Sequence, residues 1–353
     1  MDGPFSVLFS CACLCLSLIL SPILCRQVYA VKTIKAMNAY NDSFYERLLL
    51  QLIKCENKIQ VEHFVSSAQL QKITNHLKST YPALFHLTSL MCEQSSFSEK
   101  AVLYPQYIYS KDQYTDYKKQ ISEKTKQVKQ KLLTINSCFD KEGYVHDYLC
   151  KNVRYFDDNS MKGHCLVGPL LYGQGVCDGI SQAAQFLLKE GGIRSYIVFG
   201  EAKNSLHPNF LPHAWNVIEV DNKWYHLDVT FDLSLSNQSI RYDYYNLCTT
   251  QISKDHRIKY ISPLIDCNCE YDYYSNKHLV FKDFDILRKY FSFAISQRKS
   301  HFQFRFDAPY NDKLYQDIIA IWNTIVQNNN LHIEYQLSIN YCRSIFSWEV
   351  QYQ

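Results

Sequence analysis

The first part of the chain carries apolar residues at helical spacing. Residues 42–56 place apolar side chains three or four positions apart, which predicts an amphipathic helix. Ser66 precedes a second periodic segment that ends before Pro82, and serine is a preferred residue at a helix N-terminus. Residues 101–109 are rich in tyrosine and predict a strand. We therefore expect residues 31–115 to form a small α/β accessory domain.

A run of helices follows. Residues 116–136 predict one helix rich in lysine and glutamine, whose charges are expected on a solvated face. Residues 144–153 predict a second helix, and residues 180–188 predict an apolar helix that stops at a pair of glycines. Residues 194–200 then predict a strand. We assign residues 116–261 to one core domain.

Two alternating segments, residues 212–220 and 223–231, predict a β-hairpin closed by residues 221–222. With a two-residue loop, His213 and Asp228 become diagonal neighbours on one face of the hairpin. Diagonal Cα atoms lie about 7–8 Å apart, within reach of a hydrogen bond between these side chains. A three-residue loop would send the two side chains to opposite faces.

The last part of the chain, residues 262–353, alternates again. Residues 281–296 and 313–327 predict two amphipathic helices, set between short strand-like segments in the order β-α-β-α-β-β. We expect a C-terminal α/β domain. No group of chemically reactive residues stands out within it, which favours a binding or packing module.

The N-terminus has the pattern of a leader. Residues 5–25 form an apolar run without charge, followed by the small-residue pattern at Val28 and Ala30. We expect residues 1–30 to be a secretory signal peptide cut after Ala30. An uncleaved membrane anchor is the alternative, because the run is long enough to span a bilayer. With either interpretation we expect the protein to be secreted or attached to the cell surface.

Composition narrows the classes of function. The 353 residues suffice for two or three domains, and 47% hydrophobic with 20% charged residues is typical of a globular protein. A formal net charge of +3, without a basic stripe, argues against a nucleic-acid partner. Membrane contact is expected only through the N-terminal segment, if it is retained.

Cysteine is frequent, with 14 residues in the chain. Some disulfides are plausible outside the cytosol, although their pairing cannot be deduced. Cys267 and Cys269, with Cys248 and His256 upstream, point only weakly to a metal, because their C-x-C spacing differs from that of a zinc finger. Loop cysteines or a disulfide are favoured, and we expect neither a metal nor a cofactor.

One segment places a thiol at the start of a helix. Residues 173–181 read GQGVCDGIS, so Cys177 follows two glycines and opens the apolar helix. A helix N-terminus and a neighbouring imidazole both favour the nucleophilic thiolate. His213 would supply the imidazole, and Asp228 would fix its tautomer. Each residue alone could be structural, but their coincidence favours a catalytic triad.

Acyl transfer at such a thiol creates an oxyanion that needs hydrogen-bond donors. The backbone N–H of Cys177 is the natural first donor, and the side chain of Gln174 or Tyr172 is a candidate for the second. Trp215 lies two residues after His213. It would shield the histidine from water or simply pack in the core.

The sequence resembles a known family in several stretches. They are YGQGVCDGISQAAQFLLKEGGIRSYIVFGEA, HAWNVIEVDNKWYHLDVTFD, YDYYNLCTTQISKDHR and, upstream, GYVHDYLCKNVRYFDD. Together, over residues 140–260, they look like the transglutaminase-like superfamily, closest to its bacterial extracellular members. The resemblance implies an α+β protein with a papain-like core, in which a helix bearing the nucleophile packs on an antiparallel sheet. It also implies Cys177 as nucleophile, His213 as base and Asp228 as the residue that orients the base.

The resemblance implies thiol-mediated acyl transfer that crosslinks or deamidates glutamine side chains of a protein or peptide. The first alternative is a cysteine amidase or peptidase that acts on peptide or cell-wall amides. The second is a non-enzymatic surface binding or scaffold protein of the same fold. The intact set of three residues argues against the second alternative.

Overall fold

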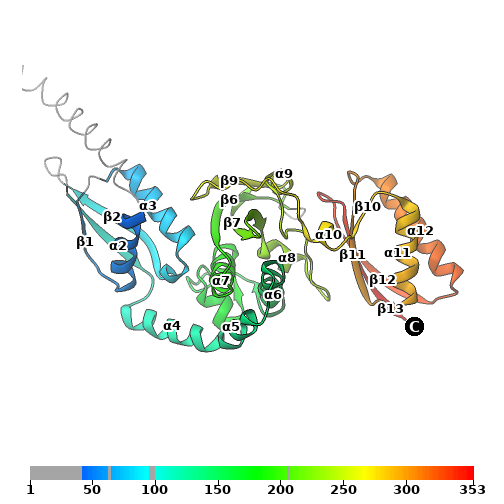
Figure 1. Ribbon diagram of the computed structural model, residues 1–353, viewed down its shortest axis with the longest axis horizontal. Helices are drawn as coiled ribbons and strands as arrows, with labels where there is room; N and C mark the ends of the chain where they lie inside the picture. Colours follow the sequence, from blue (N-terminus) through cyan, green and yellow to red (C-terminus); the bar gives the residue numbers. More distant parts are fainter. Residues whose placement is uncertain (1–41, 63–64, 95–99, 205–206) are drawn as a thin grey trace, which may run out of the picture. The chain divides into compact units, whose positions relative to one another are not determined.

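The computed structural model describes residues 42–353 except residues 63–64, 95–99 and 205–206. The expected leader, residues 1–30, lies outside the described residues. The chain divides into two compact units, Met1–Asp116 and Tyr117–Gln353 (Figure 1). Among the helices that the structure describes, none combines the length and apolarity needed to cross a membrane.

The first unit is a small α/β domain. Helix α3 starts with a capping box, in which Ser66 Oγ accepts the Gln69 N–H at 3.3 Å and Gln69 Oε1 accepts the Ser66 N–H at 2.9 Å. Strands in the order β1-β3-β2 form an antiparallel sheet whose apolar residues pack with those of α2 and α3. The elements are α2 (Asp42–Ile53), β1 (Ile59–Val61), α3 (Ser67–Thr80), η1 (Pro82–Leu84), β2 (Leu87–Gln94) and β3 (Ala101–Tyr107).

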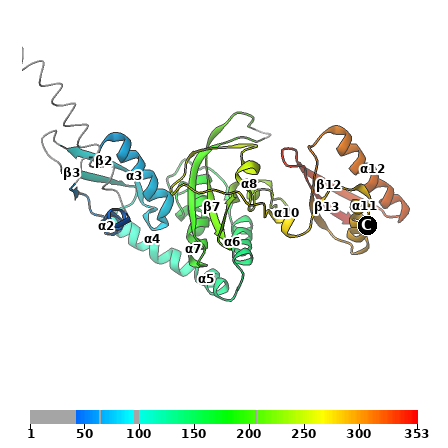
Figure 2. The ribbon, with the colours of Figure 1, turned by 45° about the horizontal axis from the view of Figure 1, so that its top comes forward.

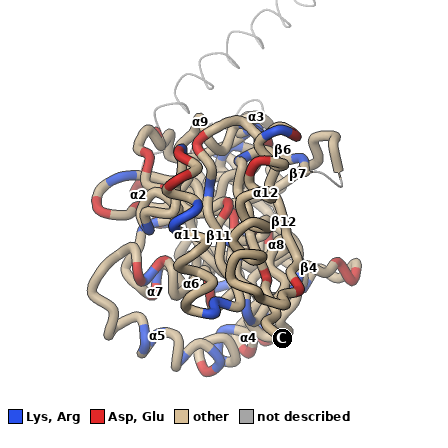
Figure 3. Tube along the Cα trace, turned by 90° about the vertical axis from the view of Figure 1, so that its right-hand side faces the viewer, with Lys and Arg blue, Asp and Glu red and all other residues tan. Residues whose placement is uncertain are grey.

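The single helix predicted over residues 116–136 is wrong, because two helices occupy this stretch. They are α4 (Lys111–Lys124) and α5 (Lys126–Leu133), separated at Thr125. The buried Thr125 hydroxyl donates a hydrogen bond to the Ile121 carbonyl at 2.8 Å. Such back-bonding to the preceding turn bends helices, which explains the interruption. Basic and acidic positions are interspersed along the trace (Figure 3).

The core of the second unit combines helices with an antiparallel sheet of strand order β8-β7-β6-β9. Helix α7 packs against β6 and β7, and α6 packs against α7 (Figure 2). The helices are α6 (Cys138–Asn152), η2 (Gly168–Tyr172), α7 (Cys177–Glu190), α8 (Val229–Leu235) and α9 (Thr249–Ile252). The strands are β4 (Arg154–Tyr155), β5 (Gln174–Gly175), β6 (Ser195–Ala202), β7 (Leu211–Val220), β8 (Lys223–Leu227) and β9 (His256–Tyr260).

The hairpin of β7 and β8 has the expected register. Val220 pairs with Lys223, and the two-residue loop has positive φ angles at Asp221 and Asn222, 51° and 61°. Positive φ at both positions is the type I′ geometry that matches the twist of paired strands. The predicted second strand is too long, however. It ends at Leu227, and residues 229–231 belong to α8.

The C-terminal part of the second unit is a four-stranded sheet of order β10-β11-β13-β12, with α11 and α12 packed on it (Figure 1). Only the β10–β11 pair of this sheet is parallel. Phe291, Trp322 and Trp348 are fully buried in its core. The elements are α10 (Tyr273–Asn276), β10 (Val280–Phe281), α11 (Phe284–Ser296), β11 (His301–Phe306), α12 (Asp312–Asn328), β12 (Ile333–Asn340) and β13 (Ile345–Tyr352).

No disulfide links the cysteines of the described residues. Cys267 and Cys248 are both buried thiols, so the disulfide considered for this group of cysteines is not formed. Burial, followed by the charges of neighbouring groups, raises the pKa of Cys267 to about 12. This thiol is therefore protonated and serves as core packing rather than as a reactive group.

Candidate active site

Cys177 is the first residue of α7, as the glycine-rich segment predicted. The loop before it is tightly folded. Gly173 has a φ of +66°, and a Cβ on Gly175 would lie 2.8 Å from Pro169 Cγ. Both positions therefore require glycine. The loop delivers the thiol to the N-terminus of a 14-residue helix, where the helix dipole favours an anion.

The structure brings together the three residues singled out in the sequence. His213 on β7 donates a hydrogen bond from Nε2 to Asp228 Oδ2 at 2.7 Å. The Cys177 side chain contributes to the raised pKa of His213, so the thiol lies near the imidazole. Because Nε2 is occupied by Asp228, Nδ1 is the ring nitrogen left for the thiol. The structure thus brings thiol, imidazole and carboxylate together in one site.

The two oxygens of Asp228 have different partners. Oδ1 accepts the Phe231 N–H at 3.1 Å and so caps the N-terminus of α8. This cap starts a helix immediately after Leu227, which explains why the predicted strand is shorter than expected. Oδ2 faces His213. The helix cap therefore holds the carboxylate in the orientation that the imidazole needs.

Burial and charge act in opposite directions on this pair. Burial would lower the pKa of His213, but the charge and hydrogen bond of Asp228, with a contribution from Cys177, raise it to about 10. Burial would raise the pKa of Asp228, but His213 and His256 lower it well below its usual range. The site therefore stabilises an imidazolium beside an ionised carboxylate, the charge state that a thiolate partner requires.

His256 is a site residue that the sequence reasoning missed. It stands at the start of β9 and donates from Nε2 to Asp228 Oδ2 at 3.0 Å. From the sequence it is only a weak candidate metal ligand beside cysteines. The segment KDHR offered one signal for a site residue, because Asp255 stands directly before His256 in it. Its contact with Asp228 depends on the pairing of β9 with β6, which no local pattern specifies.

Trp215 is fully buried beside the triad. Its ring stacks near His213, with centroids 6.0 Å apart, and its Nε1–H donates to His226 Nδ1 at 3.1 Å. Burial, with the charge of His256, lowers the pKa of His226 to about 3, so this neutral ring can accept the indole proton. Trp215 thus fills the core and also covers one side of the imidazole.

The two candidate oxyanion donors make other contacts. Gln174 Nε2 donates to Asp158 Oδ2 at 3.3 Å, and its Oε1 accepts from Arg154 Nη2 at 3.1 Å. Tyr172 is half-exposed, and the Lys162 ammonium lies 5.0 Å from its ring centre. These contacts orient both side chains toward the surface loop. The backbone N–H of Cys177, at the first position of α7, remains the expected oxyanion donor.

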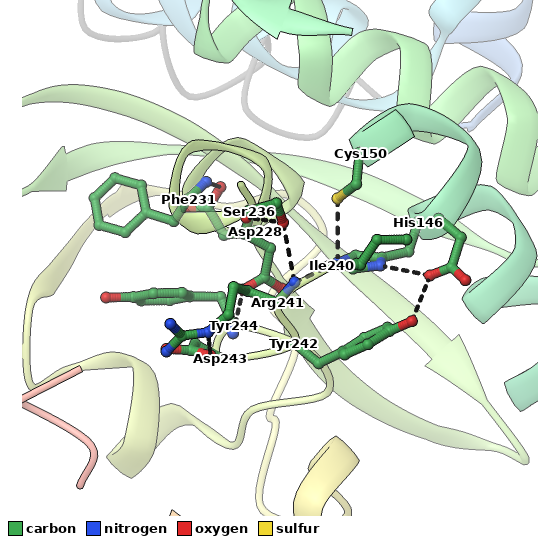
Figure 4. A network of polar contacts seen from close by, with 12 residues as sticks. His146, Cys150, Asp228, Phe231, Ser236, Ile240, Arg241, Tyr242, Asp243 and Tyr244 are labelled. Atoms are coloured by element: carbon green, nitrogen blue, oxygen red, sulfur yellow. Dashed lines mark hydrogen bonds and ion pairs between the residues drawn. The ribbon is translucent and has the colours of Figure 1, made fainter. Parts of the chain in front are cut away.

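A second cysteine, histidine and aspartate cluster lies between α6 and α8 (Figure 4). His146 Nε2 is 3.1 Å from Asp232 Oδ2 and 3.7 Å from Cys150 Sγ. Burial opposes protonation of His146, but Cys150 and the carboxylates of Asp147 and Asp232 raise its pKa. Cys150 lies near the C-terminus of α6, where the helix dipole disfavours a thiolate. Cys177, at a helix N-terminus, is therefore the better nucleophile.

His213, Asp228 and His256 are also the one group of possible metal ligands within the described residues, with ligand atoms within 4.8 Å of one another. The distances between these atoms fit hydrogen bonds better than they fit ligands around one metal ion. Ligand atoms around a tetrahedral zinc ion lie about 3.3 Å apart. The nitrogen-to-oxygen distances here are 2.7 and 3.0 Å, and both are normal for charge-assisted hydrogen bonds.

Comparisons with known proteins give a family match for part of the chain. A family model described as the transglutaminase-like superfamily matches residues 122–229, which include Cys177, His213 and Asp228. A solved TGase aligns over 49% of this chain and 51% of its own, at 16% identity and a TM-score of 0.29. This chain thus spans about half the length of that TGase. No curated protein matches the sequence.

Two bacterial proteins with solved structures, both proposed to be proteases, also align. The alignment with a proposed cysteine protease from Cytophaga hutchinsonii covers 41% of this chain and 62% of that protein, at 13% identity and a TM-score of 0.28. The alignment with the protein from Parabacteroides distasonis covers 40% of this chain and 36% of that protein, at 12% identity and a TM-score of 0.23. On the match over residues 122–229, the chain carries a transglutaminase-like superfamily domain.

Proposed function

We propose that the protein is an acyltransferase that acts on glutamine side chains through a Cys177–His213–Asp228 triad. The observation that supports this most directly is the hydrogen bond of 2.7 Å from His213 Nε2 to Asp228 Oδ2, together with the thiol of Cys177 at the N-terminus of α7, which raises the pKa of His213. These are the parts that thiol-mediated acyl transfer needs.

In the proposed reaction the Cys177 thiolate attacks the carbonyl carbon of a glutamine side chain. The oxyanion that forms accepts a hydrogen bond from the Cys177 backbone N–H. His213 then gives its proton to the leaving nitrogen, so that ammonia departs and a thioester remains. A primary amine or water, deprotonated by His213, resolves the thioester. An amine gives a crosslink, and water gives glutamate.

The same steps on a backbone or cell-wall amide would make the protein an amidase or peptidase. The triad fits either substrate class, so the acceptor and the scissile amide decide between them. We further propose that the enzyme acts outside the cytosol, on the basis of the apolar run at residues 5–25. N-terminal sequencing of the protein recovered from medium and membrane fractions tests this location. Soluble cytosolic protein with residues 1–30 still attached would overturn it.

The test of the reaction is incubation of the full chain with a glutamine peptide and a labelled primary amine. Ammonia release and amine incorporation are followed together, with Cys177→Ser as the control. Incorporation supports a transglutaminase, and ammonia without incorporation supports a deamidase. Cleavage of the peptide backbone instead would support the peptidase. Wild-type rates no higher than those of Cys177→Ser across a panel of glutamine peptides would contradict the glutamine proposal.

A further inference from the structure

His256 lies between two carboxylates. Its Nε2 is 3.0 Å from Asp228 Oδ2, and its Nδ1 is 2.7 Å from Asp255 Oδ1. All three side chains are buried. Each ring nitrogen thus faces a carboxylate oxygen within hydrogen-bond distance. His256 then joins the triad aspartate to a second, buried carboxylate.

Asp255 is in turn held by the C-terminal part of the unit. Arg343, in the turn between β12 and β13, donates from Nη2 to Asp255 Oδ1 at 2.8 Å. Its Nη1 donates to the Gln251 carbonyl, also at 2.8 Å. Tyr244 donates to the other Asp255 oxygen at 2.8 Å, and the Arg343 guanidinium lies 4.4 Å from the Tyr244 ring centre. Arg343 is only 6% exposed.

The result is a buried row of side chains joined by hydrogen bonds, from Asp228 through His256 and Asp255 to Arg343. Each side chain has a polar partner in the row, which is the condition under which buried polar groups are tolerated. Removal of Arg343 leaves Asp255 with a weaker cationic environment, so Asp255 competes more strongly for His256. The hydrogen bond from His256 to Asp228 Oδ2 would then lengthen or turn, and Asp228 would lose one of its three restraints.

We propose that His256 and Arg343 are positioning residues for the triad, and that the β12–β13 turn takes part in forming a competent active site. This inference rests on the proposed function, because it assumes that Asp228 orients His213 during the reaction. It gives the C-terminal α/β part of the chain a defined contribution. Without the Arg343 contact, Cys177 and His213 remain in place but Asp228 is less well oriented.

A purely structural role for Arg343 is the competing explanation, and Arg241 is the matched control. Arg241 is also a buried arginine, 1% exposed, and holds Asp243 through two hydrogen bonds of 3.0 and 2.7 Å (Figure 4). It also contacts the C-terminal sheet, through a 2.8 Å hydrogen bond to Ser338. Substitution of either arginine should lower the melting temperature, but only Arg343 connects to Asp228 through His256.

The experiment is a double-mutant cycle on the full chain. The rate of Cys177 alkylation by iodoacetamide at pH 7 is measured by mass spectrometry for Arg343→Met, His256→Leu and Arg241→Met. Each is made both with Asp228 and in the Asp228→Asn background. We expect Arg343→Met and His256→Leu to slow alkylation roughly tenfold with Asp228 present and less than about twofold in the Asp228→Asn background. Arg241→Met should have the same small effect in both backgrounds.

Conservative variants keep the test informative if the severe ones fail to fold. Arg343→Lys retains a charge near Asp255, and His256→Gln retains an N–H donor for Asp228, so both should alkylate closer to wild type. Equal effects of the Arg343 substitution in the two Asp228 backgrounds, or no effect in either, would overturn the positioning role while leaving the triad intact. If Asp228→Asn itself changes neither alkylation nor turnover, the proposed function fails, and the positioning role fails with it.

Discussion

Asp228 Oδ2 accepts a hydrogen bond from His213 Nε2, with 2.7 Å between the two atoms, although the residues stand 15 positions apart in the chain. A turn of only two residues, Asp221 and Asn222, joins β7 to β8 and sets a register in which Leu227, the residue before Asp228, pairs with Asn216 of β7. The cap of α8 then fixes the rotamer of Asp228. A local turn and a local helix cap together make a non-local catalytic contact.

Asp228→Asn should lower turnover by roughly 10³- to 10⁴-fold, because an amide can no longer select the tautomer and stabilise the imidazolium of His213. Steady-state kinetics on the glutamine peptide measure this loss as a fall in kcat. Asp243→Asn is the matched control, since Asp243 is also buried but contacts Arg241 instead of His213. Comparable losses in both variants would show that the effect is a general consequence of removing a buried carboxylate.

Cys177 should be alkylated by iodoacetamide at pH 7 faster than the other thiols of the chain, because it lies at the N-terminus of α7, where the helix dipole favours an anion. Its modification should abolish turnover. Cys342 is the internal reference, because its residue is exposed but partial burial of the thiol and the charge of Asp255 raise its pKa. Peptide mapping after partial alkylation measures the labelling rate of each thiol. If Cys177 and Cys342 are alkylated at the same rate, the activation of Cys177 is disproved.

Gly179→Ala should disrupt the start of α7. A Cβ at Gly179 would lie 2.1 Å from the Gly163 carbonyl oxygen, so the loop that carries Gly163 must move. Gly143→Ala is the matched control in α6, where the Cβ meets only Tyr245 Oη at 3.4 Å. That substitution should stabilise the protein by about 0.5–1 kcal/mol through helix propensity. Thermal unfolding measures both effects, and Gly179→Ala should also slow Cys177 alkylation.

Glu142 should make the protein less stable as the pH rises. Burial raises its pKa to about 8, although hydrogen bonds, including one from Asn246 Nδ2 at 2.9 Å, oppose the shift. The folded chain therefore keeps this proton to about pH 8, whereas the unfolded chain releases it near the ordinary glutamate value of 4.5. Between these values the folded state binds more protons, so the free energy of unfolding falls with rising pH.

Glu142→Gln removes this titration and retains the hydrogen bond from Asn246. Urea unfolding at about pH 5, 7 and 9 should show a decline in stability that is smaller in the variant than in wild type, by about 1 kcal/mol or more. Identical pH dependence in the two proteins would mean that Glu142 is ionised in the folded state at neutral pH.

The sequence by itself determined the features that depend on neighbouring residues. Cys177 at the start of a helix, the turn at Asp221 and Asn222, and the shared face of His213 and Asp228 all follow from patterns within a few positions. Turn geometry and strand alternation decide them before any distant contact forms. The capping box at Ser66 belongs to the same class.

Only the tertiary structure decided which distant groups reach the triad. His256 meets Asp228 because β9 pairs with the far edge of β6, and Arg343 meets Asp255 because the β12–β13 turn packs on the core. No periodicity in the sequence selects one strand edge over another, since the choice depends on apolar surface buried across the whole unit. The interruption at Thr125 likewise required the packed structure, because a threonine hydroxyl bends a helix only when it turns inward onto the carbonyl of Ile121.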